Sequence, residues 1–179
     1  MIRLHCTKKL LAKLPVRADG RLVPSADDDI EESLLSGWHA NLVTLQRRQC
    51  VLFVHDATRF PVFLPGLRKD DFAQLDTRFE SAFYETLFRS GADEAVMNNA
   101  IPAMGRFVCD SDCDRSVQGT MRRMLSDLDI TLDGGQEQLD ASSGARIAAW
   151  LADGPCTVKG RKDTVWPDRE MHAFLRASS

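Results

Sequence analysis

Alternating apolar and polar residues predict strands in the first third of the chain. Residues 2–6, IRLHC, alternate and predict a short strand. Residues 38–65 contain runs rich in valine, phenylalanine and leucine, separated by the polar turns QRRQ and DATR. This spacing is typical of a β-meander. Because proline cannot donate to a sheet ladder, Pro61 places the last of these strands at a sheet edge or at its start.

The apolar period then changes to that of helices. Phe72, Leu75, Phe79, Phe83 and Leu87 recur at steps of three and four residues, which predicts an amphipathic helix over residues 70–90. Further helices are predicted over residues 8–14, 92–100, 115–130, 143–152 and 166–175. Strands cluster early and helices late, so the predicted class is α+β. We expect a small antiparallel sheet, formed by the meander and the N-terminal strand, with several helices packed mainly on one face.

Composition and charge narrow the class of protein. The chain is 44% hydrophobic and 27% charged, which excludes collagen-like and low-complexity proteins. The net charge of −3 argues against a dedicated nucleic-acid coat protein. No apolar run approaches the roughly 18 residues of a membrane helix, and no signal peptide is recognisable. The five cysteines are odd in number and scattered, which favours reduced thiols and a cytoplasmic location.

Three stretches, taken in order, resemble a known family. They are TKKLLAKL near the start, WHANL followed by an R-x-x-x-L-F-V run in the meander, and RSVQGTM at residues 115–121. Together they resemble a bacterial family classed only as a domain of unknown function. The resemblance covers residues 1–130 and implies one folded unit, with no established activity, substrate or cofactor. The chain departs from the family pattern at Arg122 and Arg123, where an Asn-Asp pair is expected.

The resemblance also suggests a division of the chain. Residues 1–130 form the expected α+β core domain. Residues 131–179 follow as a helical C-terminal extension, packed on the core or tethered to it. Gly134, Gly135 and the polar stretch after them are typical of a linker.

Two helix starts form a candidate anion site. Thr7, Lys8 and Lys9 follow the first strand, and Arg115 and Ser116 open a later helix. Helix N-termini present free N–H groups and a partial positive charge, so the two starts would bind an anion if the fold brought them together. The alternative is that Thr7 caps the first helix and Asp114 or Ser116 caps the second, while the basic residues are solvated.

The loop CDSDCD, residues 109–114, is the candidate metal site. A structural zinc site needs four ligands, and the sequence holds no second pair of cysteines or histidines at ligand spacing. The alternating aspartates do not fit a calcium loop, because Arg115 and Met121 stand where glycine and glutamate are required. We therefore expect no metal site and no cofactor, only an acidic loop before a helix.

The sequence predicts no catalytic residue. Neighbours in a strand such as His5 and Cys6 point to opposite faces and cannot act as a pair. The same holds for His55 and Asp56. Signatures for a serine hydrolase, a phosphate-binding loop or a dinucleotide fold are absent from the sequence.

Two basic patches are candidate contacts for nucleic acid or a partner. Arg47 and Arg48 lie at a predicted hairpin tip, and Lys159, Arg161 and Lys162 precede Trp166. A basic tip beside an aromatic ring can contact a backbone and stack a base. Alternatively, basic residues on exposed turns only keep the edges of the sheet from pairing with another chain.

The sequence thus favours a small cytoplasmic binding or regulatory domain without catalysis. It would act through contacts with a protein partner, with an anionic ligand held at the two helix starts. The alternative is an enzyme or nucleic-acid-binding protein that acts on a phosphorylated or nucleic-acid substrate through the basic patches. Trp38 and Trp150 are expected in the core.

Overall fold

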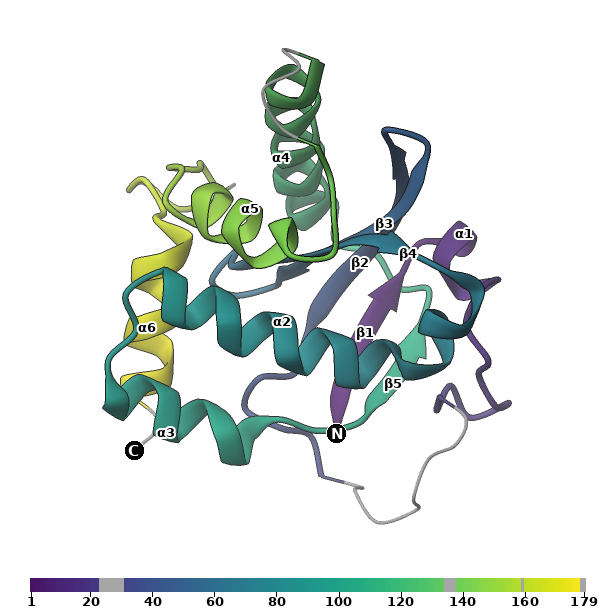
Figure 1. The fold of residues 1–179 in the computed structure, drawn as a ribbon. Coiled ribbons are helices and arrows are strands. Elements are labelled where there is room, and N and C mark those ends of the chain that lie inside the picture. The colour runs from purple at the N-terminus through teal and green to yellow at the C-terminus, as the bar shows by residue number, and fades with distance from the viewer. Residues whose placement is uncertain (23–30, 134–137, 159, 178–179) are drawn as a thin grey trace.

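A single mixed sheet organises the protein (Figure 1). The computed structural model describes residues 1–22, 31–133, 138–158 and 160–177. Within these residues the strands are β1 (Ile2–Cys6), β2 (Trp38–Leu45), β3 (Arg48–His55), β4 (Pro61–Leu67) and β5 (Phe107–Asp110). Their order across the sheet is β4-β3-β2-β1-β5. β4 is an edge strand and begins at Pro61, as the sequence predicts.

The sheet departs from the antiparallel arrangement that we expected. The meander β2-β3-β4 is antiparallel, but β1 pairs in parallel with both β2 and β5. Parallel neighbours require a long crossover, and the chain supplies one on each side of the meander. The four-residue strand β5 was not predicted. Phe107 and Cys109 are its buried positions, too few to give a clear alternating pattern.

The helices occupy the predicted parts of the chain. They are α1 (Lys8–Leu11), the 3₁₀ helix η1 (Lys69–Gln74), α2 (Leu75–Arg89), α3 (Glu94–Ala103), α4 (Arg115–Asp133), α5 (Ser143–Ala152) and α6 (Pro167–Arg176). The predicted apolar stripe of η1 and α2, from Phe72 to Leu87, is buried. α1 ends three residues earlier than predicted, at Leu11 rather than at residue 14.

Helices cover both faces of the sheet, not mainly one. On the first face, α2 inserts Phe79 against Trp38 and Phe53, with ring centroids 4.9 and 5.0 Å apart, and α3 and α6 share this core. On the second face, Met121 and Met124 of α4 share a separate buried cluster with β3 and α5. The physical reason is that six consecutive residues of β3 are buried, and a strand apolar on both faces must be covered on both.

The C-terminal helices pack on the sheet and on α2. α5 lies along β4 and α2, and Met171 and Leu175 of α6 are buried in the first core. Trp38 is fully buried as expected, whereas Trp150 is 50% exposed, which corrects our expectation. The inward stripe of α5 is formed by Ile147, Ala148 and Leu151, which leaves Trp150 pointing outward. The division at residue 130 stays a prediction. Among the described residues, no helix is long and apolar enough to cross a membrane.

Candidate functional site

Polar side chains form a row across three adjacent parallel strands. His5 of β1 is paired in register with His39 of β2 on one side and with Asp110 of β5 on the other. Strand neighbours on either side of His5, Leu4 and Cys6, are buried in the first core, so the row lies on the second face. α4 packs on the meander, which leaves this part of the second face open to a cavity.

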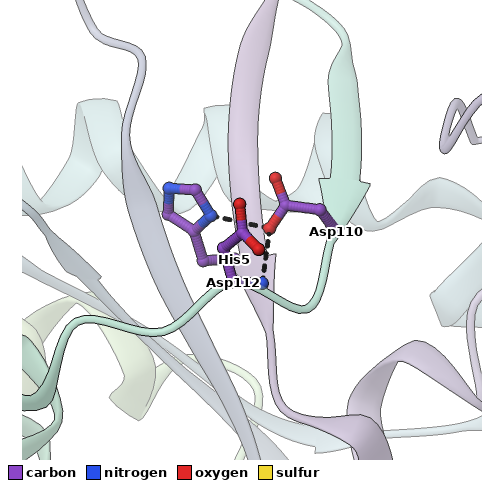
Figure 2. Close-up of side chains that lie close together, drawn as sticks. All are labelled: His5, Asp110 and Asp112. Atoms are coloured by element: carbon purple, nitrogen blue, oxygen red, sulfur yellow. Dashed lines mark hydrogen bonds and ion pairs between the residues drawn. The ribbon is translucent and has the colours of Figure 1, made fainter.

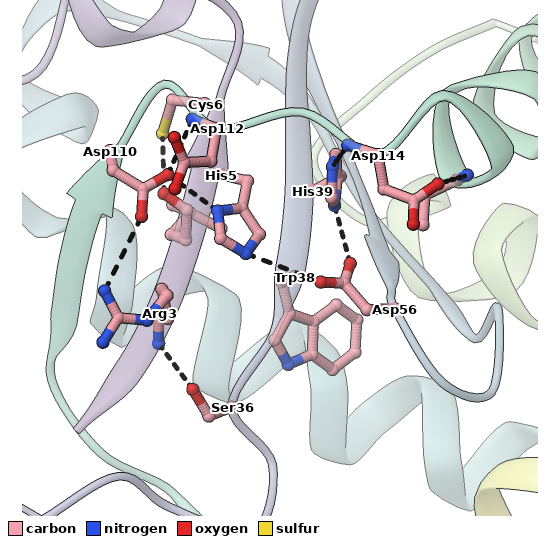
Figure 3. A network of polar contacts seen from close by, with 12 residues as sticks. Arg3, His5, Cys6, Ser36, Trp38, His39, Asp56, Asp110, Asp112 and Asp114 are labelled. Atoms are coloured by element: carbon pink, nitrogen blue, oxygen red, sulfur yellow. Dashed lines mark hydrogen bonds and ion pairs between the residues drawn. The ribbon is translucent and has the colours of Figure 1, made fainter.

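The row belongs to a chain of imidazole and carboxylate groups (Figure 3). His5 Nδ1 lies 2.7 Å from Asp110 Oδ1, and His5 Nε2 lies 3.6 Å from Asp56 Oδ2. The backbone N–H of Asp114 donates to His39 Nε2 at 2.8 Å. In the neutral ring the proton of His39 is therefore on Nδ1, which donates to Asp56 Oδ1 at 2.6 Å. Asp56 is thus held by His39 and faces His5.

A third ligand-type side chain joins His5 and Asp110 (Figure 2). The backbone N–H of Asp112 donates to Asp110 Oδ1 at 2.9 Å, and this turn brings the Asp112 carboxylate back towards His5. One ligand atom from each of the three side chains lies within 4.8 Å of the others. Our expectation of no metal site considered the spacing within the acidic loop alone. His5, which the fold brings to that loop, was outside that pattern.

Two members of the cluster, His5 and Asp112, lie on the wall of a cavity of about 350 Å³. His5 and Asp112 line the cavity together with the cations Lys8 and Arg122. The Thr7 hydroxyl is buried there and has no hydrogen-bond partner among the described residues. The cavity therefore combines a histidine–carboxylate cluster with two positive charges.

The structure separates the residues of the predicted anion site between two cavities. Thr7 and Lys8 line this cavity, Lys9 is exposed, and Arg115 and Ser116 line a second groove. Thr7 precedes α1 but makes no capping hydrogen bond. The start of α4 is capped from within the chain, because the Asp114 carboxylate accepts the N–H groups of Ser116 at 2.6 Å and Val117 at 3.3 Å. These bonds lower the pKa of Asp114.

The two predicted basic patches lie apart. Gln46 and Arg47 form the tight turn between β2 and β3, both with positive φ, and Arg48 begins β3. Arg161 pairs with Glu170 at 3.1 Å and Lys162 is exposed, while Lys159 lies outside the described residues. The ring of Trp166 is already stacked by the Arg169 guanidinium at 4.5 Å. Contact with nucleic acid or a partner at these patches stays a prediction.

His55 and Cys6, a histidine and a cysteine considered above for catalysis, are buried in the core. Burial lowers the pKa of His55 to about 4, so its ring stays neutral near neutral pH. Two causes raise the pKa of the Cys6 thiol: the larger is a hydrogen bond with Cys109, and the smaller is burial. A protonated buried thiol is a poor nucleophile. Sequence reasoning correctly separated His5 from Cys6, but it missed the grouping of His5 with Asp56, Asp110 and Asp112.

These features define an α+β protein with a histidine–carboxylate cluster on the open part of a mixed sheet. The chain belongs to the family described as a domain of unknown function, DUF6933, whose model matches residues 3–170. This match confirms the resemblance found in the sequence and continues into α6. Searches of curated proteins and of solved structures gave no match. The site itself must therefore support any functional conclusion.

Proposed function

We propose that the protein is a metal-dependent hydrolase that acts on a small phosphorylated substrate. His5, Asp110 and Asp112 would hold one divalent transition-metal ion. The observation that carries the proposal is the convergence of their ligand atoms, within 4.8 Å of one another, beside a cavity of about 350 Å³ that His5 and Asp112 line.

The donor set and its surroundings suit such an ion. One imidazole nitrogen with two carboxylates is a ligand type used for zinc, manganese and iron(II). Two ligands that each lie about 2.1 Å from a metal are about 3 Å apart at an octahedral ion and about 3.4 Å apart at a tetrahedral one. His5 Nδ1 and Asp110 Oδ1 are 2.7 Å apart, so a shift of a few tenths of an ångström gives the octahedral spacing. Asp56 faces the other nitrogen of His5, the place of the outer carboxylate that usually orients a metal-bound histidine.

The remaining lining of the cavity favours an anionic substrate. Three protein ligands would leave coordination positions of the metal open for water and substrate. A metal ion lowers the pKa of the water bound at such a position towards neutrality. Lys8 and Arg122 supply positive charge on the same cavity wall. A volume of about 350 Å³ is within the range of small-molecule sites. Hydrolysis would transfer the phosphoryl group to water and release the alcohol.

Metal titration of the chelator-treated protein tests the metal site directly. By calorimetry with Zn²⁺ and Mn²⁺, we expect one ion to bind per chain. Asp112→Asn should weaken binding at least tenfold by removing a ligand, and Asp56→Asn should weaken it about tenfold through His5. Asp163→Asn is the matched control, because Asp163 is exposed and is not part of the cluster. Equal affinity in the Asp112 variant and this control contradicts the metal site.

An activity assay then tests the hydrolase. With p-nitrophenyl phosphate, the metal-loaded protein should release nitrophenol, and Lys8→Gln should raise KM by weakening the contact with the phosphate. Stoichiometric metal binding without turnover on a panel of phosphate esters contradicts the hydrolase and leaves the metal site standing.

A binding domain that acts through protein contacts is the second candidate. Large apolar side chains that are more than half exposed, Phe88, Ile101 and Ile130, together with Trp150, favour it. The five cysteines are free thiols, which supports a cytoplasmic location. Native mass spectrometry separates the two candidates. A mass increased by one metal ion favours the hydrolase, whereas a protein complex that Trp150→Glu disrupts favours the binding domain.

A further inference from the structure

A second groove, separate from the histidine–carboxylate cluster, runs between the first half of α4 and residues 156–158 and 160–161. Its volume is about 580 Å³. Three arginines line it, Arg115, Arg123 and Arg161, and none of the described residues lining it carries a carboxylate. We propose that this groove binds a ligand that carries two or more adjacent phosphate groups.

The spacing of the arginines favours more than one phosphate. Arg115, Gly119 and Arg123 follow one another at four-residue intervals and all line the groove. At 1.5 Å per helical residue, Arg115 and Arg123 begin about 12 Å apart along α4, which is more than a single phosphate spans. Gly119 between them leaves open space where a side chain would stand, since no heavy atom lies within 4 Å of its Cβ position. Arg161 lines the same groove from outside α4.

The charges of the groove are only partly neutralised by the protein. Arg115 makes no ion pair among the described residues. Arg161 is paired with Glu170 at 3.1 Å, and Arg123 lies 4.0 Å from Asp127 and donates to the carbonyl of Pro155. A phosphate ligand would thus meet one unpaired guanidinium and two that still have free N–H groups, the donor geometry that binds phosphate best.

A buried arginine lies beneath the groove. Arg59 is 5% exposed, and its Nη2 donates to Ser116 Oγ at 3.2 Å. Because the Ser116 oxygen accepts this bond, its own O–H can donate to a ligand in the groove. The Nε of Arg59 is buried and has no hydrogen-bond partner among the described residues. Two carboxylates, Asp114 and Asp56, act on Arg59 and offset part of its charge. What Arg59 contributes to the groove is the hydrogen bond that orients Ser116 Oγ.

The chain offers a matched arginine control outside both cavities. Arg89, the last residue of α2, is exposed and lines neither the first cavity nor the groove. The variants Arg115→Gln, Arg161→Gln and Arg89→Gln each remove one charge from an exposed side chain, so the fold should be kept. Thermal unfolding of each variant verifies this.

Calorimetry of the full, metal-free chain with sodium tripolyphosphate tests the proposal. We expect one molecule to bind per chain, at least tenfold more tightly than inorganic phosphate, with affinity falling as salt rises. Arg115→Gln and Arg161→Gln should each weaken binding about tenfold, while Arg89→Gln should not. His5→Gln should bind like the wild type, so failure of the metal site and failure of the groove are distinguishable.

The contradicting results are specific. Absence of saturable binding overturns the proposal, as does a loss in the Arg89 variant that equals the losses in the groove variants. Competition then identifies the source of the phosphates. Displacement by ATP at lower concentration than by a hexathymidylate strand indicates a nucleotide, and the reverse order indicates a nucleic-acid backbone. The proposal also fails if neither competes, because both carry adjacent phosphates.

Discussion

A close approach of α5 to the edge strand β4 predicts the effect of a single methyl group. A Cβ atom added at Gly144 of α5 would lie 2.6 Å from the carbonyl oxygen of Phe63 and 2.8 Å from Cδ of Pro65. Ordinary contacts of this kind begin near 3.4 Å. Gly144→Ala must therefore move α5 away from β4 by about 0.8 Å, the difference between 3.4 and 2.6 Å. Both obstacles belong to the strand itself, so neither can rotate aside.

The magnitude follows from two opposing effects. Alanine is better than glycine in a helix by about 1 kcal/mol. Overpacking costs about 1–3 kcal/mol, and moving α5 also loosens the contacts of Ile147 and Leu151 with the second core. We expect a net loss of about 2 kcal/mol, which lowers the melting temperature by roughly 4–8 °C in a chain of this size. Gly119→Ala is the control. No atom lies within 4 Å of its Cβ, so it should raise the melting temperature by roughly 2–4 °C.

Circular dichroism melts of both variants measure these shifts. An unchanged or raised melting temperature for Gly144→Ala would refute the close approach of α5 to β4. The shape of the melt also tests the division at residue 130. A single cooperative transition at lower temperature argues that α5 belongs to the core domain. Two separate transitions in the variant support an extension that unfolds on its own.

Three further predictions concern pH, capping and thiols. Burial lowers the pKa of His55 to about 4 from 6.5, so below pH 6.5 the unfolded state takes up the proton first. Stability should therefore fall between about pH 6.5 and pH 4 by about 3 kcal/mol, and urea unfolding that is independent of pH over this range would contradict it. Asp114→Ala should cost about 1 kcal/mol because α4 loses its cap, whereas Asp114→Asn should cost much less in the same urea assay. Iodoacetamide should modify exposed Cys113 in the native protein before any of the other four cysteines, which are buried. Mass spectrometry that finds a buried thiol modified first refutes this assignment.

Local patterns predicted most of the elements. The stripe from Phe72 to Leu87 identified the helical segment that became η1 and α2, because an apolar period of 3.6 needs only neighbouring residues. The alternation of residues 2–6 likewise predicted that His5 and Cys6 lie on opposite faces. β5 was missed because two apolar positions carry too little periodicity to separate a strand from a loop.

The sequence by itself therefore determined the α+β class, the meander and the faces on which individual side chains lie. Only the tertiary structure decided which strands are neighbours. His5 and Asp110 are 105 residues apart in the chain and 2.7 Å apart in space, because β1 and β5 pair in parallel through long crossovers. The tertiary structure also brought Arg115 and Arg161 together in one groove, although the sequence assigned them to different patches. Periodicity records which face a residue occupies, but strand order depends on contacts between distant segments that a local pattern does not contain.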